Sequence, residues 1–330
     1  MENDTATSQD GAGFKPLVSI IIPTRNGAST LSELLAVLAL QTMQAAEILV
    51  VDSSSTDETV SIAKQYGACV RSIPQESFDH GGTRTDIAKQ ARGEYLVFFT
   101  QDAIPATRDA LAQLLQPLFS MPEAAVCYGR QLPQKNAIWA AAALRAFNYP
   151  VQSAVRVFAD RKHHGLKTIF VSNTFAAYRK SALAEVGYFK NGLIFGEDTC
   201  TVGRLLERGY ASIYASEAKV YHSHNYTWLE EFRRSFDIGV LHTAEQWLLD
   251  TFGKPEGVGL SFVRSQLSTL WQQREFSLMA DILLRSACKF AGYTLGRWHR
   301  KLPTRLIPHL SMHRGWWSGK NTGPGSCSAD

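Results

Sequence analysis

FDHGGTRTDIAKQARGEYLVFFTQDAIP, residues 78–105, is the stretch that decides the fold of this chain. It predicts a glycine-bearing turn, a helix over 83–91, a strand ending at Thr100, and then a single carboxylate. The apolar run at 96–99 is typical of a strand inside a parallel sheet. In open α/β sheets, ligands bind outside the carboxyl ends of the strands, where Gln101 and Asp102 lie. A carboxylate there can hold a divalent cation against a diphosphate; taken alone, Asp102 also reads as an ordinary turn former or helix cap.

The flanking sequence alternates strands with helices. Residues 17–22 form a β-branched run that stops at Pro23, as a buried strand does. Strands separated by helices of about ten residues predict right-handed βαβ units and a mostly parallel sheet. The helix that opens at Ser29 has the apolar spacing of one helix face, with Leu31, Leu34, Leu35 and Leu38. Further strands are expected over 47–51, 69–73 and 125–128, and further helices over 57–66 and 108–119.

After Gly129 the pattern is less regular. Residues 148–165 read as a loop that could face a second substrate, with His163 and His164 exposed in it. A helix is expected from Glu197 to Arg208, closed by Gly209. The other expected elements are a strand over 169–178, a helix over 181–186, a strand pair over 212–221, and long helices over 227–249 and 262–297.

Composition narrows the class of protein. The 330 residues are 45% hydrophobic and 19% charged, which indicates a folded globular chain with one large α/β domain plus an appendage, or two domains. The five cysteines are scattered and form no CxxC pair, so they favour a reducing, cytosolic setting. Residues 1–14 are polar and acidic, and they read as a flexible leader and not as a signal peptide. No apolar run approaches the roughly 18–20 residues that span a bilayer.

The net charge of +4 is unevenly distributed. Residues 282–329 contain eight Lys or Arg and no acid, interleaved with aromatic residues. This pattern favours an anionic membrane surface. Packing of the aromatics on the main domain, and nucleic-acid binding, are the alternatives. We expect a membrane-surface partner and no nucleic acid.

Four polar segments follow strands of the predicted sheet. They are PTRNG at 23–27, DSSSTD at 52–57, QDA at 101–103 and GEDT at 196–199. Each is weak alone, because turns are rich in these residue types. Together on one edge of one sheet they predict a nucleotide-diphosphate site with a base nearby. The absence of GxGxxG and GxxxxGK[ST] argues against a dinucleotide dehydrogenase and a phosphate-loop NTPase.

These strings resemble glycosyltransferase family 2, the inverting enzymes of the GT-A fold. The similarity is carried by IIIPTRNG, ILVVDSSSTDET, GEYLVFFTQDAIP and FGEDTCTVGRLLERGY. FDHGGTR, TQDAIP, GEDT and HSHNYTWLEEFRRSFDIGVLH are similar to its bacterial rhamnosyltransferase branch, which builds O-antigen and other cell-surface polysaccharides. The resemblance implies an α/β catalytic domain over 15–225, with a mostly parallel sheet flanked by helices. A helical, basic C-terminal region over 226–330 would follow.

The resemblance also implies a donor site. Asp52 should accept a hydrogen bond from the imide N–H of a pyrimidine, and Arg84 should stand near the diphosphate. Asp102 occupies the final position of the DxD metal motif, which is reduced here to Gln101-Asp102-Ala103. A Mg²⁺ or Mn²⁺ ion would then take most of its oxygen ligands from diphosphate and water. The resemblance assigns the base pocket and the other contacts with the donor nucleotide sugar to Pro23, Thr24, Arg25, Ser54 and Gln101.

The acceptor side is implied in the same way. Asp198 matches the general base that deprotonates the acceptor hydroxyl, and Glu197 beside it is expected to hold the acceptor. The metal-binding histidine is His222 or His224, and the alternation from Val220 favours His222. Arg234 matches the arginine of a QxxRW-like element and would stabilise the leaving diphosphate. Ser235 replaces the tryptophan of that element, which disfavours processive synthesis.

The leading hypothesis is transfer of one L-rhamnose from dTDP-L-rhamnose to a lipid-diphosphate-linked glycan at the cytoplasmic membrane face. One alternative keeps the chemistry and changes the nucleotide sugar. Another is a catalytically silent sugar- or nucleotide-binding subunit of a polysaccharide assembly complex. Two single residues also have an alternative interpretation without a catalytic or binding role. Asp198 can be an acid that stabilises a helix N-terminus, and Asp52 can be an ordinary turn residue.

Overall fold

The computed structural model describes residues 17–254 and 256–319. The first four strands of the chain are parallel neighbours in the sheet. They are β1 (Val18–Thr24), β2 (Glu47–Asp52), β3 (Cys69–Ser72) and β4 (Tyr95–Phe99). The other strands are β5 (Ile104–Pro105), β6 (Ala124–Leu132), β7 (Ala154–Arg156), β8 (Phe175–Arg179) and β9 (Ala211–Tyr221).

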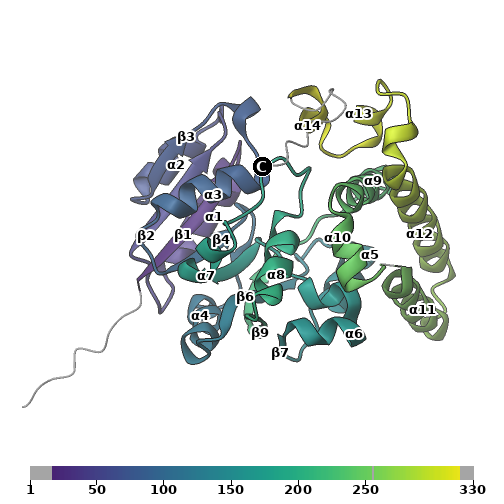
Figure 1. The fold of residues 1–330 in the computed structure, drawn as a ribbon, viewed down its shortest axis with the longest axis horizontal. Coiled ribbons are helices and arrows are strands. Elements are labelled where there is room, and N and C mark those ends of the chain that lie inside the picture. The colour runs from purple at the N-terminus through teal and green to yellow at the C-terminus, as the bar shows by residue number, and fades with distance from the viewer. Residues whose placement is uncertain (1–16, 255, 320–330) are drawn as a thin grey trace, which may run out of the picture.

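Within the described residues these strands form one sheet in the order β3-β2-β1-β4-β8-β6-β9-β5, with β7 paired to β9 (Figure 1). Strand β8 is antiparallel to both of its neighbours, β4 and β6, whereas β6 and β9 are parallel. The expected parallel arrangement therefore holds for β1 to β4, and the sheet as a whole is mixed.

Alternate side chains of the strands face two helical layers, as the two-residue period of a strand dictates. Ile20 and Val97 pack with the helices α1 (Ala28–Ala39) and α4 (Ala110–Ser120). On the opposite face, Ile21 and Phe98 pack with α3 (His80–Gln90) and α8 (Glu197–Glu207). The four leucines predicted to form the stripe of α1 are all buried, which confirms that helix.

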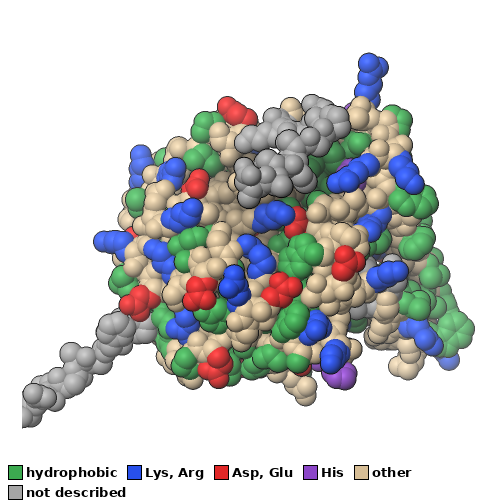
Figure 2. Space-filling view, in the orientation of Figure 1, with side chains coloured by type: hydrophobic (Ala, Val, Ile, Leu, Met, Phe, Trp, Pro, Cys, Tyr) green, Lys and Arg blue, Asp and Glu red, His purple; other side chains and the backbone are tan. Residues whose placement is uncertain are grey.

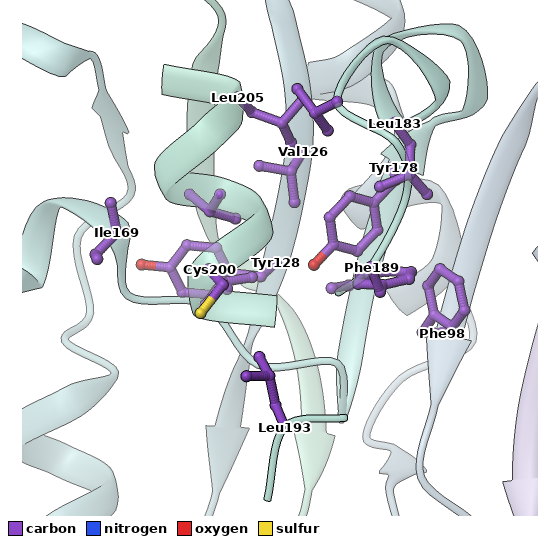
Figure 3. Packing of buried hydrophobic residues seen from close by; sticks show 14 of the residues in the cluster. Phe98, Val126, Tyr128, Ile169, Tyr178, Leu183, Phe189, Leu193, Cys200 and Leu205 are labelled. Carbon is purple, nitrogen blue, oxygen red and sulfur yellow. The ribbon is translucent and has the colours of Figure 1, made fainter. Parts of the chain in front are cut away.

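The second layer contains a tight aromatic group (Figure 3). The ring of Phe189 lies edge-on to Phe98 and Tyr178, with centroid distances of 5.1 and 5.4 Å. Tyr178 is fully buried, and its hydroxyl donates a hydrogen bond to Asn173 Oδ1 at 2.9 Å. This bond joins the core to the loop before β8, so core packing fixes one wall of the site described below.

Several predicted boundaries were wrong. The expected turn at 78–82 is the start of α3, because Asp79 caps it by accepting a hydrogen bond from Gly82 N at 2.6 Å. The expected loop at 148–165 carries β7 and α6 (Arg161–His164), and α5 (Trp139–Asn148) precedes it. The expected strand pair over 212–221 is the single strand β9, and the strand expected from 169 begins at Phe175.

The remaining helices before the C-terminal region are short. They are α2 (Thr59–Gln65), α7 (Lys180–Glu185), and the 3₁₀ turns η1 (Gln75–Ser77), η2 (Phe158–Asp160) and η3 (Gly165–Ile169).

The C-terminal region is helical. It comprises α9 (Trp228–Ala244), α10 (Gln246–Phe252), α11 (Glu256–Gln273), α12 (Phe276–Arg297), η4 (His299–Lys301), α13 (Ile307–Leu310) and α14 (Arg314–Gly319). The two long helices expected here are each divided, the first at Glu245 and the second near Arg274, whose φ is 60°. In the part of the chain that is described, none of the helices combines the length and apolarity needed to cross a bilayer.

Helices α9 and α12 touch backbone to backbone. A Cβ added at Gly296 would lie 2.0 Å from Phe236 O, and one at Gly292 would lie 2.2 Å from Phe232 O. Helix α9 also contributes Phe236 and Val240 to the core layer that contains Phe98. After α12 the chain turns back toward α3 through α13 and α14 (Figure 1).

Two expectations fall partly or wholly outside these residues. The leader predicted over 1–14 lies outside the described range, as does Cys327. The other four cysteines, Cys69, Cys127, Cys200 and Cys288, are free thiols.

Candidate active site

The nucleotide corner is built from the ends of β1, β2 and β4. Asp52 ends β2, opposite Thr24 of β1 in the register, and only 2% of its surface is exposed. Its carboxylate accepts hydrogen bonds from the backbone N–H and the hydroxyl of Ser55. Ser54 has a φ of 58° and donates its hydroxyl hydrogen bond to Ile73 O at 2.9 Å, so that side chain is engaged by the loop after β3.

Gln101 ties two of these strand ends together. Its Oε1 accepts from the Thr24 hydroxyl and from Arg25 N, the latter at 2.9 Å, while its Nε2 donates to Arg25 O at 3.2 Å. The predicted donor residues Pro23, Thr24, Arg25, Asp52, Ser54 and Gln101 therefore lie at one sheet edge, as expected from the carboxyl ends of parallel strands.

A second corner gathers Asp102, His222 and His224. One ligand atom from each lies within 4.8 Å of the others, and His222 Nε2 is 3.6 Å from Asp102 Oδ2. The sequence left open which histidine belongs here, and the structure brings both to the aspartate.

The protonation of His222 follows from its partners. His222 Nδ1 lies 2.9 Å from Gln131 Oε1, which also accepts a hydrogen bond from Arg145 Nη1. Because a guanidinium only donates, this Gln131 atom is an acceptor, and His222 Nδ1 must carry the proton. Burial lowers the pKa of His222 to about 3, so Nε2 presents a free lone pair toward Asp102. Two imidazoles and one carboxylate are donors that fit a divalent cation such as Mn²⁺.

A third corner holds the two acids at the start of α8. Asp198 Oδ1 accepts from Thr199 N at 2.7 Å, and Oδ2 accepts from Asn173 N at 3.2 Å. Burial, followed by the charge of Glu197, raises the pKa of Asp198 to about 6. Burial alone would raise the pKa of Glu197 too, but the charges of Arg84 and His80 bring it below its usual value. Near neutral pH Glu197 is thus a fixed anion and Asp198 is able to exchange a proton.

Arg84 forms an ion pair with Glu197 in this acidic corner. Its Nη1 lies 3.2 Å from Glu197 Oε1 and donates to His80 O at 2.9 Å, and the residue is 5% exposed. The sequence predicted a position near the diphosphate, and the contact seen here is with Glu197.

Arg234 of α9 packs on the ring of Phe195 and acts electrostatically on two of the corners. Its guanidinium carbon lies 5.5 Å from the centre of the Phe195 ring. Its charge contributes to the lowered pKa of His222 at the metal corner and of His313 near the acidic corner.

Several residues at the site were not predicted as functional, and four of them support its three corners. Gln131 and Arg145 are hydrogen-bonded to each other and to His222 through Gln131 at the second corner. Asn173 donates hydrogen bonds to both Asp198 and Glu197, and His313, near the C-terminal end of the described residues, packs against His80. No local pattern identifies them, because each acts through partners far away in the sequence.

The chain is similar in sequence to known proteins. A model of glycosyl transferase family 2 matches residues 19–187. The chain is 38% identical over 305 residues to the O-antigen chain rhamnosyltransferase WbaN of Salmonella anatum, covering 92% of this chain and 96% of that protein. It is 39% identical over 303 residues to the O-antigen chain rhamnosyltransferase RfbN of Salmonella typhimurium, covering 91% and 96%.

Solved structures agree on the fold. A mannosyltransferase from Pyrobaculum calidifontis, in complex with GDP-Man and Mn²⁺, superposes with a TM-score of 0.60 at 18% identity, over 87% of this chain and 88% of that one. Residues 1–349 of TarS from S. aureus give a TM-score of 0.54 at 19% identity, over 91% and 87%. With a matching family model, two curated relatives of nearly full length and this fold, the chain belongs to glycosyl transferase family 2 and is a glycosyltransferase.

Proposed function

We propose that this chain is an inverting rhamnosyltransferase. It moves L-rhamnose from dTDP-L-rhamnose to a lipid-linked glycan during synthesis of O-antigen or a related cell-surface polysaccharide. The observation that carries the proposal is the likeness, over more than nine tenths of the chain, to two proteins named O-antigen chain rhamnosyltransferases. The three corners of the site supply what such a transfer needs: nucleotide contacts, a cation site and a base.

In this proposal the nucleotide corner holds the donor. Asp52 accepts the imide N–H of the thymine, while Pro23, Thr24, Arg25 and Ser54 line the base, with Gln101 fixing their loop. Support comes from the buried position of Asp52 and from the hydrogen bonds that make this sheet edge rigid.

Asp102, His222 and His224 would hold the divalent cation, Mg²⁺ or Mn²⁺. The mixture of imidazole and carboxylate ligands favours Mn²⁺, since Mg²⁺ prefers oxygen donors alone. When bound, the ion neutralises charge on the diphosphate. Arg234 adds a cation from α9, and Arg145, whose buried Nε has no partner among the described residues, adds another from α5.

Asp198 acts as the base. Above about pH 6 its carboxylate is ionised and takes the proton of the acceptor hydroxyl. The acceptor oxygen forms a bond to the anomeric carbon as the bond from that carbon to the diphosphate oxygen breaks. The nucleotide diphosphate leaves from the opposite face, so the configuration inverts. Glu197, fixed by Arg84 and Asn173, lies beside the acceptor.

We also propose that the C-terminal helical region, after a boundary near 225, contacts the cytoplasmic face of the membrane. The outward face of α12 exposes large apolar side chains at helical spacing, including Phe276, Leu283 and Phe290, and Trp298 follows. Figure 2 shows apolar side chains along the α11–α12 edge with basic side chains beside them. This arrangement suits an anionic lipid surface.

The structure narrows which basic residues could serve that contact. Arg285 and Lys289 pair with Glu231, and Arg297 donates to His242 O, so these three face other helices. Trp316 and Trp317 pack against the core. The exposed cations near Trp298 are Arg300, Lys301 and Arg305.

The test of the proposed function uses the purified full-length protein. Its acceptor is the lipid-diphosphate-linked saccharide that accumulates in cells from which the gene has been deleted. We expect transfer from dTDP-L-rhamnose, with dTDP released and the anomeric configuration inverted in the product. Transfer only from another donor, such as UDP-GlcNAc or GDP-mannose, would refute the sugar assignment. Nucleotide binding without transfer from any donor would instead identify a silent binding subunit.

A further inference from the structure

The last described segment of the chain is clasped onto the active site by Asp237. Asp237 Oδ1 accepts from Ser311 Oγ at 2.6 Å, and Oδ2 accepts from Met312 N at 3.0 Å and His313 N at 3.2 Å. The carboxyl group is fully buried on α9, three residues after Arg234. A buried carboxylate with three donors holds a loop in one position, because each bond lost would leave a polar group unsatisfied.

This clasp places the ring of His313 against two site residues. Its centroid lies 5.3 Å from that of His80, at an interplanar angle of 87°, and 6.0 Å from that of Phe195, at 21°. Phe195 leads directly into Glu197 and Asp198, and it also carries the Arg234 contact. Residues from four separate segments thus form one wall beside the acidic corner.

His313 is neutral near pH 7. Burial lowers its pKa to about 3; the charges of His80 and Arg234 act in the same direction, and Glu197 opposes them. Within the described residues, the hydrogen bonds of His313 are made by its backbone N–H, and its ring nitrogens make none. A neutral imidazole offers one donor and one acceptor, so this ring can bind a polar ligand.

We propose that His313, with Phe195 and His80, forms the wall that binds the acceptor sugar next to Asp198. A pyranose has an apolar C–H face that packs on an aromatic ring and hydroxyls that bond to an imidazole. The wall adjoins the base, which must reach the acceptor hydroxyl, and not the strand ends that hold the nucleotide. The proposal rests on the sugar transfer proposed above and adds to it a residue from the C-terminal segment.

The experiment compares full-length His313→Ala with wild type and with His309→Ala. His309 is an exposed residue four positions earlier in the same segment, so its removal controls for a general disturbance. The readouts are dTDP affinity, release of dTDP by transfer to water, and KM for the lipid-diphosphate-linked saccharide extracted from deletion cells. The reaction uses whichever donor supports transfer by the wild type, so a wrong sugar refutes the proposed donor without affecting this comparison.

For His313→Ala we expect the acceptor KM to rise at least tenfold, while dTDP affinity and transfer to water stay within about twofold. His309→Ala should match the wild type. His313→Gln keeps a donor and an acceptor on a side chain of similar reach, and it should recover much of the lost affinity. An unchanged acceptor KM, or a loss of dTDP affinity as large as the loss of acceptor affinity, would overturn the assignment. If His313→Ala unfolds, the same criteria apply to His313→Gln and His313→Phe, of which only the second should lose acceptor affinity.

Discussion

Asp198→Asn should abolish most activity and change how stability depends on pH. The substitution keeps the shape of the side chain and removes the proton acceptor, so we expect the transfer rate to fall on the order of 10²–10⁴-fold. Donor affinity should barely change, because the proposed role of Asp198 is toward the acceptor hydroxyl and not toward the nucleotide. The stability effect follows from the pKa of about 6 in the folded state, against 3.8 as the ordinary value.

The sign of that effect is set by which form the fold prefers. A raised pKa means that the fold favours the protonated acid, so ionisation costs stability above about pH 6 and nothing below the unfolded value. The full cost is roughly 3 kcal/mol near pH 8, and about half of it is recovered near pH 5. Asparagine at position 198 does not ionise, so the variant does not lose this stability at high pH. It does lose the hydrogen bond from Asn173 N, worth roughly 1–3 kcal/mol, because its amide nitrogen replaces Oδ2 and cannot accept it.

The pH dependence therefore separates the two contributions. The thermal midpoint of the variant relative to wild type should fall by about 2 °C between roughly pH 8 and pH 5. Glu207→Gln, at an exposed acid on the same helix, should show no such trend. Retention of a tenth or more of the wild-type rate would remove Asp198 from the role of base. A difference in midpoint that does not depend on pH would contradict the raised pKa.

Three other perturbations test separate parts of the structure. Asp102→Ala should weaken donor binding and flatten the response to added Mn²⁺ or Mg²⁺; full wild-type activity in excess chelator would show that the metal assignment is wrong. Gly296→Ala should cost roughly 1–3 kcal/mol by forcing α12 away from α9, whereas Gly259→Ala, in open space on α11, should gain up to about 1 kcal/mol; equal unfolding midpoints would refute the close contact. Replacing Trp298 and Arg300 with Ser and Gln should reduce cosedimentation with anionic vesicles at low salt, and cosedimentation equal to wild type at every salt concentration would exclude the segment just after α12 from the contact.

The strands and the first helices could be predicted because their signal is local. The leucine stripe of α1 and the apolar run of β4 reflect burial on one face or on both, and the structure buries those residues. The predicted helix boundaries were wrong where a single residue determines where the helix starts or stops. Asp79 starts α3 earlier than the pair of glycines suggested, and Arg274 breaks an apparently continuous helix by adopting a positive φ.

The site was predictable only as far as its residues follow strand ends. Asp52 and Asp102 follow the strands β2 and β4, which the sequence reveals. Asp198 instead lies at the start of α8 and follows no strand, so the strand end expected before 196–199 was wrong; the resemblance supplied all three roles. The partners that tune them are distant. Gln131 reaches His222 across 91 positions, and Ser311 reaches Asp237 across 74. Such pairs form only when the sheet and the helices assemble, and local sequence periodicity does not predict that assembly.

The glycine contact between α9 and α12 also limits how this chain can recombine with its relatives. At Gly239, Gly292 and Gly296 a single methyl group would collide with the opposing backbone, so neither helix can be inherited without a matching partner. Helix α9 carries Arg234 and Asp237, and the loop that Asp237 clasps lies beyond α12. A crossover placed anywhere between Trp228 and Trp317 would therefore separate parts that have to fit each other. Exchange at the start of α9 keeps them together, and it would transfer His313 with its clasp while leaving Phe195 and His80 in the other part.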